Sequence, residues 1–212
     1  MFLRFFLLQS LLLAICMWCG RRIAINKDIY RNAFIIILAF SLIEGLRWGR
    51  GIDYNIYVGV YDSFLIGDPY MTEAFLFDLL LTVMAYLNLP YQFLIIFSSF
   101  LLIICGMKWM MKYPEIMGFS VPWFYILTFS AENLFRWYIA AGFLLVAITE
   151  FLNEKRRKAL VYTIISVGFH PMMALLAILF LVLSFKKNIL IVPLGALCIY
   201  IGISVVWSTD FM

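Results

Sequence analysis

Charged residues are scarce in this chain of 212 residues. Asp, Glu, Lys and Arg together make up 13% of it, against about 25% in soluble domains. So few charges cannot cover the surface of a soluble globular domain, and that class is excluded. A disordered chain is excluded as well, since disordered segments are poor in aromatic residues, whereas 18% of this chain is aromatic and 66% is hydrophobic. The class that remains is an all-α polytopic integral membrane protein.

Metal-binding and nucleotide-binding patterns are also missing. The chain has one His and four Cys, and the cysteines lie inside apolar stretches, so we predict no metal site. No Walker loop, G-x-S-x-G or H-E-x-x-H is present, which disfavours ATP hydrolysis, serine hydrolysis and zinc proteolysis. We therefore expect no cofactor. The 16 Lys and Arg residues lie in short clusters between apolar runs; such clusters usually set membrane orientation, and we expect no nucleic-acid partner.

Apolar segments that suit membrane helices follow one another along the whole chain. They cover residues 2–19, 32–46, 73–88, 90–107, 120–132, 134–152, 159–185 and 189–207. A bilayer core takes about 20 residues of helix and several segments are shorter, so we expect about 6–8 transmembrane or re-entrant helices. No Pro/Gly/Ser-rich linker divides the chain, and we treat residues 1–212 as a single transmembrane domain.

Basic clusters predict the orientation of this domain. They occupy the loops at about 20–31, 153–158 and 186–188, which should be cytoplasmic because Lys and Arg are enriched in cytoplasmic loops. The loop at about 47–72 carries an excess of acidic residues and suits the outer side. The N-terminus is then outside as well.

This orientation requires an odd number of crossings between the outer loop and the cytoplasmic loop at 153–158, yet four segments lie between them. One segment therefore does not cross. Segment 73–88 is the preferred candidate, because it carries Glu73 and Asp78. The alternative is segment 120–132, which contains Pro122 near its start.

Segment 159–185 presents a similar choice, because both of its flanks are basic. We expect a helix break at His170-Pro171, with two short helices that enter and return and place His170 deep in the protein. Irregular backbone at that depth must be buried or line a wet cavity. The alternative is one long tilted helix kinked at Pro171.

The densest group of polar and aromatic residues follows segment 32–46. It contains Arg47, Arg50, Asp53, Tyr54 and Tyr57. Two guanidinium groups beside a turn can hold phosphate or carboxylate through forked hydrogen bonds, and tyrosine rings suit sugars. The alternative is an interfacial belt with Arg–Asp pairing.

Further candidates lie near the later segments, where ionisable residues in a membrane tend to be functional. Arg136, with Asn133 just before it, lies near the outer start of segment 134–152 and suits an anionic lipid-linked substrate. The alternative is a snorkelling Arg136 or an ion pair with Glu132. His170 can accept a proton near neutral pH, and Glu73 lies close enough to Asp78 in sequence for the two to face one cavity.

Four blocks of residues, taken in order and spacing, carry a resemblance to a known family. They are Arg47, Gly51, Asp53, Tyr54 and Tyr57; Glu73 with Phe75 and Leu79; Phe135-Arg136 with Ile139-Ala140; and Phe169-His170. The chain resembles the EpsG family of bacterial exopolysaccharide and O-antigen (Wzy-like) polymerases. It departs from the family pattern at Trp137, where Gln is usual, and at Met172, where Ser is usual. Family members are usually longer, so we expect a truncated or short member.

The resemblance implies transfer of a glycan from undecaprenyl diphosphate to a new lipid-linked repeat unit, at the outer face of the bacterial inner membrane. It implies that Arg47, Arg136 and Arg50 bind the diphosphate. The proton of the acceptor hydroxyl would go to His170, or to Asp53 or Glu73.

The implied substrate contacts are Tyr54, Tyr57, Glu73 and Asn133. Membrane lipids are implied partners, with a chain-length regulator or flippase beside them. The rival interpretations are a lipid-linked glycan transporter or flippase, a membrane O-acyltransferase, and a non-catalytic subunit of a polysaccharide assembly system. A transporter often shows internal repeats, and we find none here.

Overall fold

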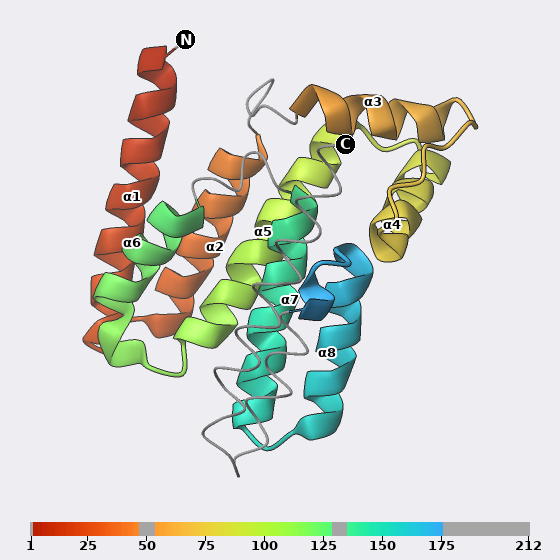
Figure 1. Cartoon of the computed structure of the whole chain (residues 1–212). Coiled ribbons are helices and arrows are strands. Elements are labelled where there is room, and N and C mark those ends of the chain that lie inside the picture. Colours follow the sequence, from red (N-terminus) through yellow and green to blue (C-terminus); the bar gives the residue numbers. More distant parts are fainter. Residues whose placement is uncertain (1, 47–53, 129–134, 176–212) are drawn as a thin grey trace, which may run out of the picture.

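The computed structural model describes residues 2–46, 54–128 and 135–175 (Figure 1). Its regular elements are α1 (Phe2–Ala24), α2 (Ile29–Gly45), α3 (Tyr54–Leu65), α4 (Phe75–Tyr86), α5 (Tyr91–Met110), the short 3-10 helix η1 (Pro114–Ile116), α6 (Met117–Thr128), α7 (Phe135–Leu152) and α8 (Arg156–Phe169). No strand occurs within these ranges. The prediction of an all-α protein is therefore confirmed for the part of the chain that the structure describes.

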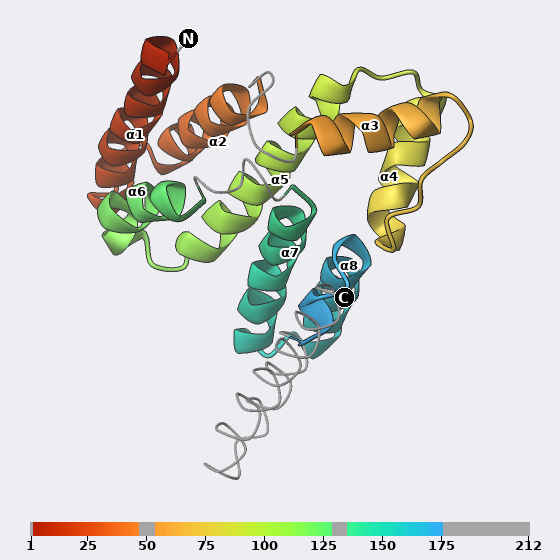
Figure 2. The ribbon, with the colours of Figure 1, turned by 45° about the horizontal axis from the view of Figure 1, so that its top comes forward.

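Two apolar cores hold the helices together, and α5 contributes to both (Figures 1 and 2). The first core joins α5 to α1, α2 and α6 and is centred on Leu12, Ile36, Phe40, Ile103 and Val121. The second joins α5 to α3, α4, α7 and α8 and is centred on Tyr61, Phe77, Leu81, Ile139 and Phe169. The apolar residues of α5 can therefore be buried on two sides of that helix.

Two helices, α1 over Phe6–Ala24 and α5, are long and apolar enough to cross a membrane by length and composition. The expectation of about six to eight spans or re-entrant helices is thus not confirmed in number. Large apolar side chains are exposed on the outside of the molecule, among them Phe34 (62%), Phe119 (67%) and Leu127 (69%). Exposed apolar surface of this extent is typical of proteins that contact lipid.

One end of the helical bundle is basic. The links from α1 to α2, from α5 to α6 and from α7 to α8 all lie at this end (Figure 1). These links carry basic residues such as Lys27, Lys112 and Lys155, whereas the opposite end carries Asp62 and Asp68 in and just after α3. Each end therefore has the charge that the predicted orientation requires; which end faces the cytoplasm stays a prediction.

Asp28, in the link from α1 to α2, shows how charges pair at the basic end. Its carboxylate accepts hydrogen bonds from Arg22 at 2.8 Å and from Arg31 at 2.6 Å. The hydrogen bond from Arg22, helped by the positive charges around it, lowers the pKa of Asp28 below its ordinary value.

Three predicted loop boundaries need correction. α1 continues to Ala24 and α2 begins at Ile29, so the predicted loop at 20–31 is shorter. The loop at 153–158 ends earlier, because α8 begins at Arg156. The predicted outer loop at 47–72 contains the helix α3, which lies across the end of the bundle (Figure 1). The loop at 186–188 and the segment 189–207 lie outside the described residues.

Segment 73–88 contains a helix of only 12 residues, α4. At 1.5 Å per residue such a helix spans about 18 Å, less than the bilayer core of about 30 Å. α6 also has 12 residues, so length alone does not choose between the two candidates. The path of the chain distinguishes them (Figure 1). The helix α3 and the start of α5 lie at the same end of the bundle, and α4 between them runs back toward that end. By contrast, α6 begins at the basic end, and the next helix, α7, begins at the opposite end. This path favours α4 as the element that does not cross.

The helix break at His170-Pro171 is confirmed. α8 ends at Phe169, and His170 has an extended backbone with φ −154° and ψ 111°. The N–H of Met173 then donates to the carbonyl of His170 at 2.9 Å, which closes a tight turn. The remainder of the predicted segment, from residue 176 to 185, lies outside the described residues.

Candidate functional site

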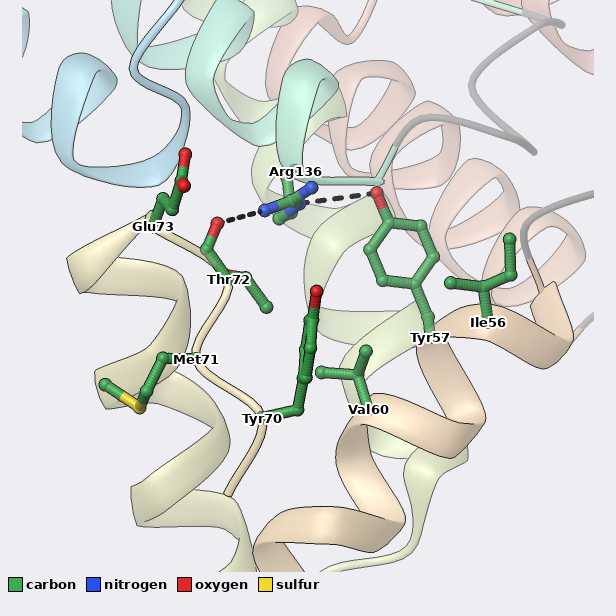
Figure 3. A pocket seen from close by; sticks show the side chains of 8 residues that line it. All are labelled: Ile56, Tyr57, Val60, Tyr70, Met71, Thr72, Glu73 and Arg136. Atoms are coloured by element: carbon green, nitrogen blue, oxygen red, sulfur yellow. Dashed lines mark hydrogen bonds between the residues drawn. The ribbon is translucent and has the colours of Figure 1, made fainter. Parts of the chain in front are cut away.

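A pocket of about 390 Å³ opens between α3, the non-helical stretch 66–74 and the first turn of α7 (Figure 3). It is lined by Ile56, Tyr57, Val60, Tyr70, Met71, Thr72, Glu73 and Arg136. The lining combines one cation, one carboxylate and two tyrosine rings with an apolar wall. It lies toward the end of the molecule opposite the basic end.

The acceptors that hold Arg136 within the described part of the chain are neutral. Its Nη1 donates to the carbonyl oxygen of Thr72 at 2.9 Å, and its Nε donates to the hydroxyl of Tyr57 at 3.4 Å (Figure 3). The guanidinium also lies over the rings of Tyr57 and Phe77, 5.8 Å and 5.7 Å from their centroids.

No carboxylate forms an ion pair with Arg136 among the described residues. A guanidinium has five N–H donors, and the contacts among the described residues engage two of them. Within this part of the chain, the other three donors meet no acceptor. A half-buried cation in this state favours an anion with several oxygens, such as a phosphate.

Thr72 connects Arg136 to a buried carboxylate. Asp78, in the first turn of α4, is only 4% exposed. It accepts a hydrogen bond from the hydroxyl of Thr72 at 2.6 Å and from the backbone N–H of Thr72 at 3.1 Å. Thr72 is thus held by Asp78 through its N–H and hydroxyl, and by Arg136 through its carbonyl.

Glu73 lies at the edge of the pocket (Figure 3). Its backbone has a positive φ of 63°, in the left-handed region that non-glycine residues rarely adopt. This conformation turns the chain sharply between Thr72 and the start of α4. The side chain of Glu73 is exposed, so a bound molecule can reach its carboxylate.

His170 lies beside this pocket but is not part of its lining. It is half-buried, and Arg136 is near enough for its charge to act on the imidazole. The Nδ1 atom of His170 is buried and has no hydrogen-bond partner among the described residues. A ring nitrogen near Arg136 is therefore not engaged by the described residues.

Close packing holds the end of α8 against α4 and α7. Gly168 touches α4 so closely that an added Cβ would come within 2.6 Å of Cδ1 of Leu76. On the other side, the Ser166 hydroxyl donates to the carbonyl of Ala140 in α7 at 2.6 Å. These contacts place the break after Phe169, and with it His170, near the first turn of α7.

The structure brings together three of the predicted site residues, Arg136, Tyr57 and Glu73, and places His170 next to them. Tyr54 is buried at the start of α3 and packs edge-on against Tyr91, away from the pocket lining. The predicted site residues Arg47, Arg50, Asp53 and Asn133 lie outside the described residues.

Sequence reasoning missed the role of Thr72. Asp78 and Glu73 line one further pocket of about 470 Å³, as expected, and the two oxygens of Asp78 also accept hydrogen bonds from Thr72. A threonine six residues before a buried aspartate carries no recognisable pattern, because the contact depends on the path of the stretch 66–74.

The fold and this pocket define a class: a helical membrane protein with a pocket that contains the arginine Arg136 toward one end of its bundle. The sequence model of the EpsG family matches residues 4–211, and the chain belongs to this family. The family implies a membrane protein with a Wzy-like role in exopolysaccharide polymerisation. No curated protein and no solved structure matches the chain.

Proposed function

We propose that this chain polymerises lipid-linked oligosaccharide repeat units in the synthesis of exopolysaccharide, capsule or O-antigen. The donor is a glycan on undecaprenyl diphosphate, and the acceptor is the next lipid-linked repeat unit. The observation that carries the proposal is Arg136, a cation held by neutral groups in a pocket that also offers Tyr57 and Tyr70. A diphosphate beside a sugar matches this combination of charge and aromatic surface.

The reaction exchanges one bond to the anomeric carbon for another. The bond between the donor glycan and its diphosphate breaks, and a bond to the acceptor hydroxyl oxygen forms. Arg136 binds the diphosphate and stabilises the charge that develops as it leaves. The acceptor proton passes to His170, whose neutral imidazole is a suitable base near pH 7. The products are a lengthened lipid-linked glycan and undecaprenyl diphosphate.

The remaining predicted residues complete the proposed site. Arg47 and Arg50 supply further positive charge, and Asp53 is an alternative proton acceptor, as is Glu73. Asn133 and Tyr57 contact the substrate, whereas Tyr54, predicted as a further contact, is buried against Tyr91 and has no such role in this proposal. The chain works as a multi-pass protein of the bacterial inner membrane, with the pocket at the outer face, beside a chain-length regulator or flippase.

A deletion strain complemented with variant chains tests this function. The strain receives the native chain, Arg136→Gln or His170→Ala, at matched amounts in the membrane, and surface polysaccharide is separated on a gel. We expect only the native chain to restore the polymer ladder, while single lipid-linked repeat units accumulate with both variants. Arg157→Gln is the matched control, because Arg157 is exposed at the basic end.

Two outcomes would contradict the proposal at different levels. An intact ladder in the deletion strain would show that polymerisation is not the task of this chain. Full restoration by both Arg136→Gln and His170→Ala would leave polymerisation standing and remove these residues from the site.

A further inference from the structure

The carboxylate of Asp78 acts on the cation of the pocket without touching it. Asp78 binds Thr72 through the threonine hydroxyl and N–H, and the carbonyl of Thr72 accepts from Arg136. The contacts therefore run from the carboxylate of Asp78 to Thr72, and from Thr72 to the guanidinium of Arg136. These contacts join the first turn of α4 to the first turn of α7 through Thr72; Figure 3 shows the contact between Thr72 and Arg136.

This arrangement orients Arg136 through a carbonyl, and among the described residues no carboxylate touches its guanidinium. A direct Arg–carboxylate pair commonly uses two parallel N–H donors and would occupy the guanidinium. Here the carbonyl of Thr72 takes a single donor at 2.9 Å. Asp78, which is 4% exposed, receives both polar hydrogens of Thr72 and so restrains the residue that carries this carbonyl.

The stretch that carries Thr72 depends on few such anchors. It is non-helical, and Gly67 within it has a positive φ of 82°. Its other anchors are the N–H of Tyr70, which donates to the Ser63 hydroxyl in α3 at 2.8 Å, and the N–H of Asp68, which donates to the Ser63 carbonyl at 3.1 Å. Loss of the Asp78 contact would remove the restraint that Asp78 places on Thr72.

We infer that Thr72 and Asp78 are positioning residues that aim Arg136 at the diphosphate of the lipid-linked donor. This inference rests on the proposed function, since it assumes that Arg136 binds that diphosphate. It assigns Asp78 no contact with substrate and no proton transfer. Its effect on the ligand passes entirely through Thr72 and Arg136.

Binding of farnesyl diphosphate, a short polyprenyl diphosphate, to the full chain in phosphatidylcholine nanodiscs tests the inference. Thr72→Val removes the hydroxyl and keeps the carbonyl, while Thr72→Ser keeps both. We expect Thr72→Val and Asp78→Asn to raise the Kd about 5- to 10-fold, within the range for one hydrogen bond to a charged group. Thr72→Ser should stay within about 2-fold of the native chain.

Thr163→Val is the matched control. It makes the same change of hydroxyl to methyl on a side chain that bonds only within α8, to the carbonyl of Ala159 at 2.9 Å. We expect its Kd to stay within about 2-fold of the native value. Thermal unfolding of each variant shows whether the chain is folded, and if Asp78→Asn does not fold, the Thr72 pair decides the question.

A double-mutant cycle separates positioning from general loss of structure. In an Arg136→Gln background, Thr72→Val should change the Kd by less than about 2-fold, because Arg136 is the group through which Thr72 acts. An equal effect in both backgrounds would overturn the inference. So would native-like binding by both Thr72→Val and Asp78→Asn. If Arg136→Gln itself binds as tightly as the native chain, the proposed diphosphate site fails as well.

Discussion

Tyr57 offers a graded test of how the pocket holds its cation. The hydroxyl of Tyr57 accepts from Nε of Arg136 at 3.4 Å, and its ring lies 5.8 Å from the guanidinium carbon. Tyr57→Phe removes only the hydroxyl, whereas Tyr57→Leu removes the ring as well. We therefore expect a small effect from the first substitution and a larger one from the second.

The distances set the size of each effect. A hydrogen bond of 3.4 Å is longer than the usual 2.9–3.0 Å, so its loss should cost about 0.5 kcal/mol, roughly a 2-fold rise in Kd. The cation–π contact should add about 0.5–1 kcal/mol. Phe77 still covers the guanidinium at 5.7 Å and limits that loss. Tyr57→Leu should thus raise the Kd for farnesyl diphosphate roughly 5- to 10-fold.

The assay is the same nanodisc titration, with polymer yield in complemented cells beside it. Tyr30→Phe and Tyr30→Leu serve as controls, because Tyr30 is 87% exposed at the basic end. Equal losses from Tyr57→Phe and Tyr57→Leu would refute the reasoning. That result would mean that the hydroxyl contacts the ligand directly and that the ring does not stabilise the cation.

Two further predictions concern contacts outside the pocket, one between α8 and α7 and the other at the basic end of α5 and α7. Ser166→Ala removes the 2.6 Å hydrogen bond to the carbonyl of Ala140, and we expect a loss of about 1 kcal/mol, measured as a lower melting temperature with the pocket intact. Lys108→Met strips the buried carboxylate of Glu150 of its 2.7 Å ion pair and should destabilise the chain by about 1–3 kcal/mol. Adding Glu150→Gln should recover most of that loss in the same melting experiment; no recovery would mean that Lys108 acts through packing alone.

Long apolar runs made most of the helices predictable. Segment 90–107 corresponds to α5, and segment 134–152 corresponds to α7. The break after Phe169 was predictable too, because proline disfavours helical backbone in the residue before it. In each case the signal lies in neighbouring residues, which is where local backbone preferences act.

The helix α3 was missed because its aromatic residues were interpreted as ligands in a loop. Tyr54, Tyr57 and Tyr61 are three and four positions apart, which is the spacing of one helix face. Tyr54 and Tyr61 are indeed buried on that face, and Tyr57 reaches the pocket beside them. The helical period was present in the sequence, and the density of polar residues around it concealed the pattern.

The candidate site was predictable as single residues but not as an arrangement. Arg136 and Glu73 stand out because charges near a membrane are costly. Their neighbours do not stand out, since Thr72 and Arg136 are 64 residues apart in sequence. Only the path of the stretch 66–74, with its left-handed turns at Gly67 and Glu73, brings Thr72 to the guanidinium.

The neutral acceptors around Arg136 suit an arginine that stabilises negative charge as it develops on a leaving group. A leaving diphosphate gains negative charge in the transition state, and donors already aimed at it stabilise that charge without reorganising. An arginine locked to a carboxylate would first have to break that pair, and its charge would be largely compensated. Asp78 bonds Thr72, and the Thr72 carbonyl and the Tyr57 hydroxyl accept from Arg136. Under the proposed mechanism, these neutral acceptors orient the guanidinium and leave its charge for the departing diphosphate.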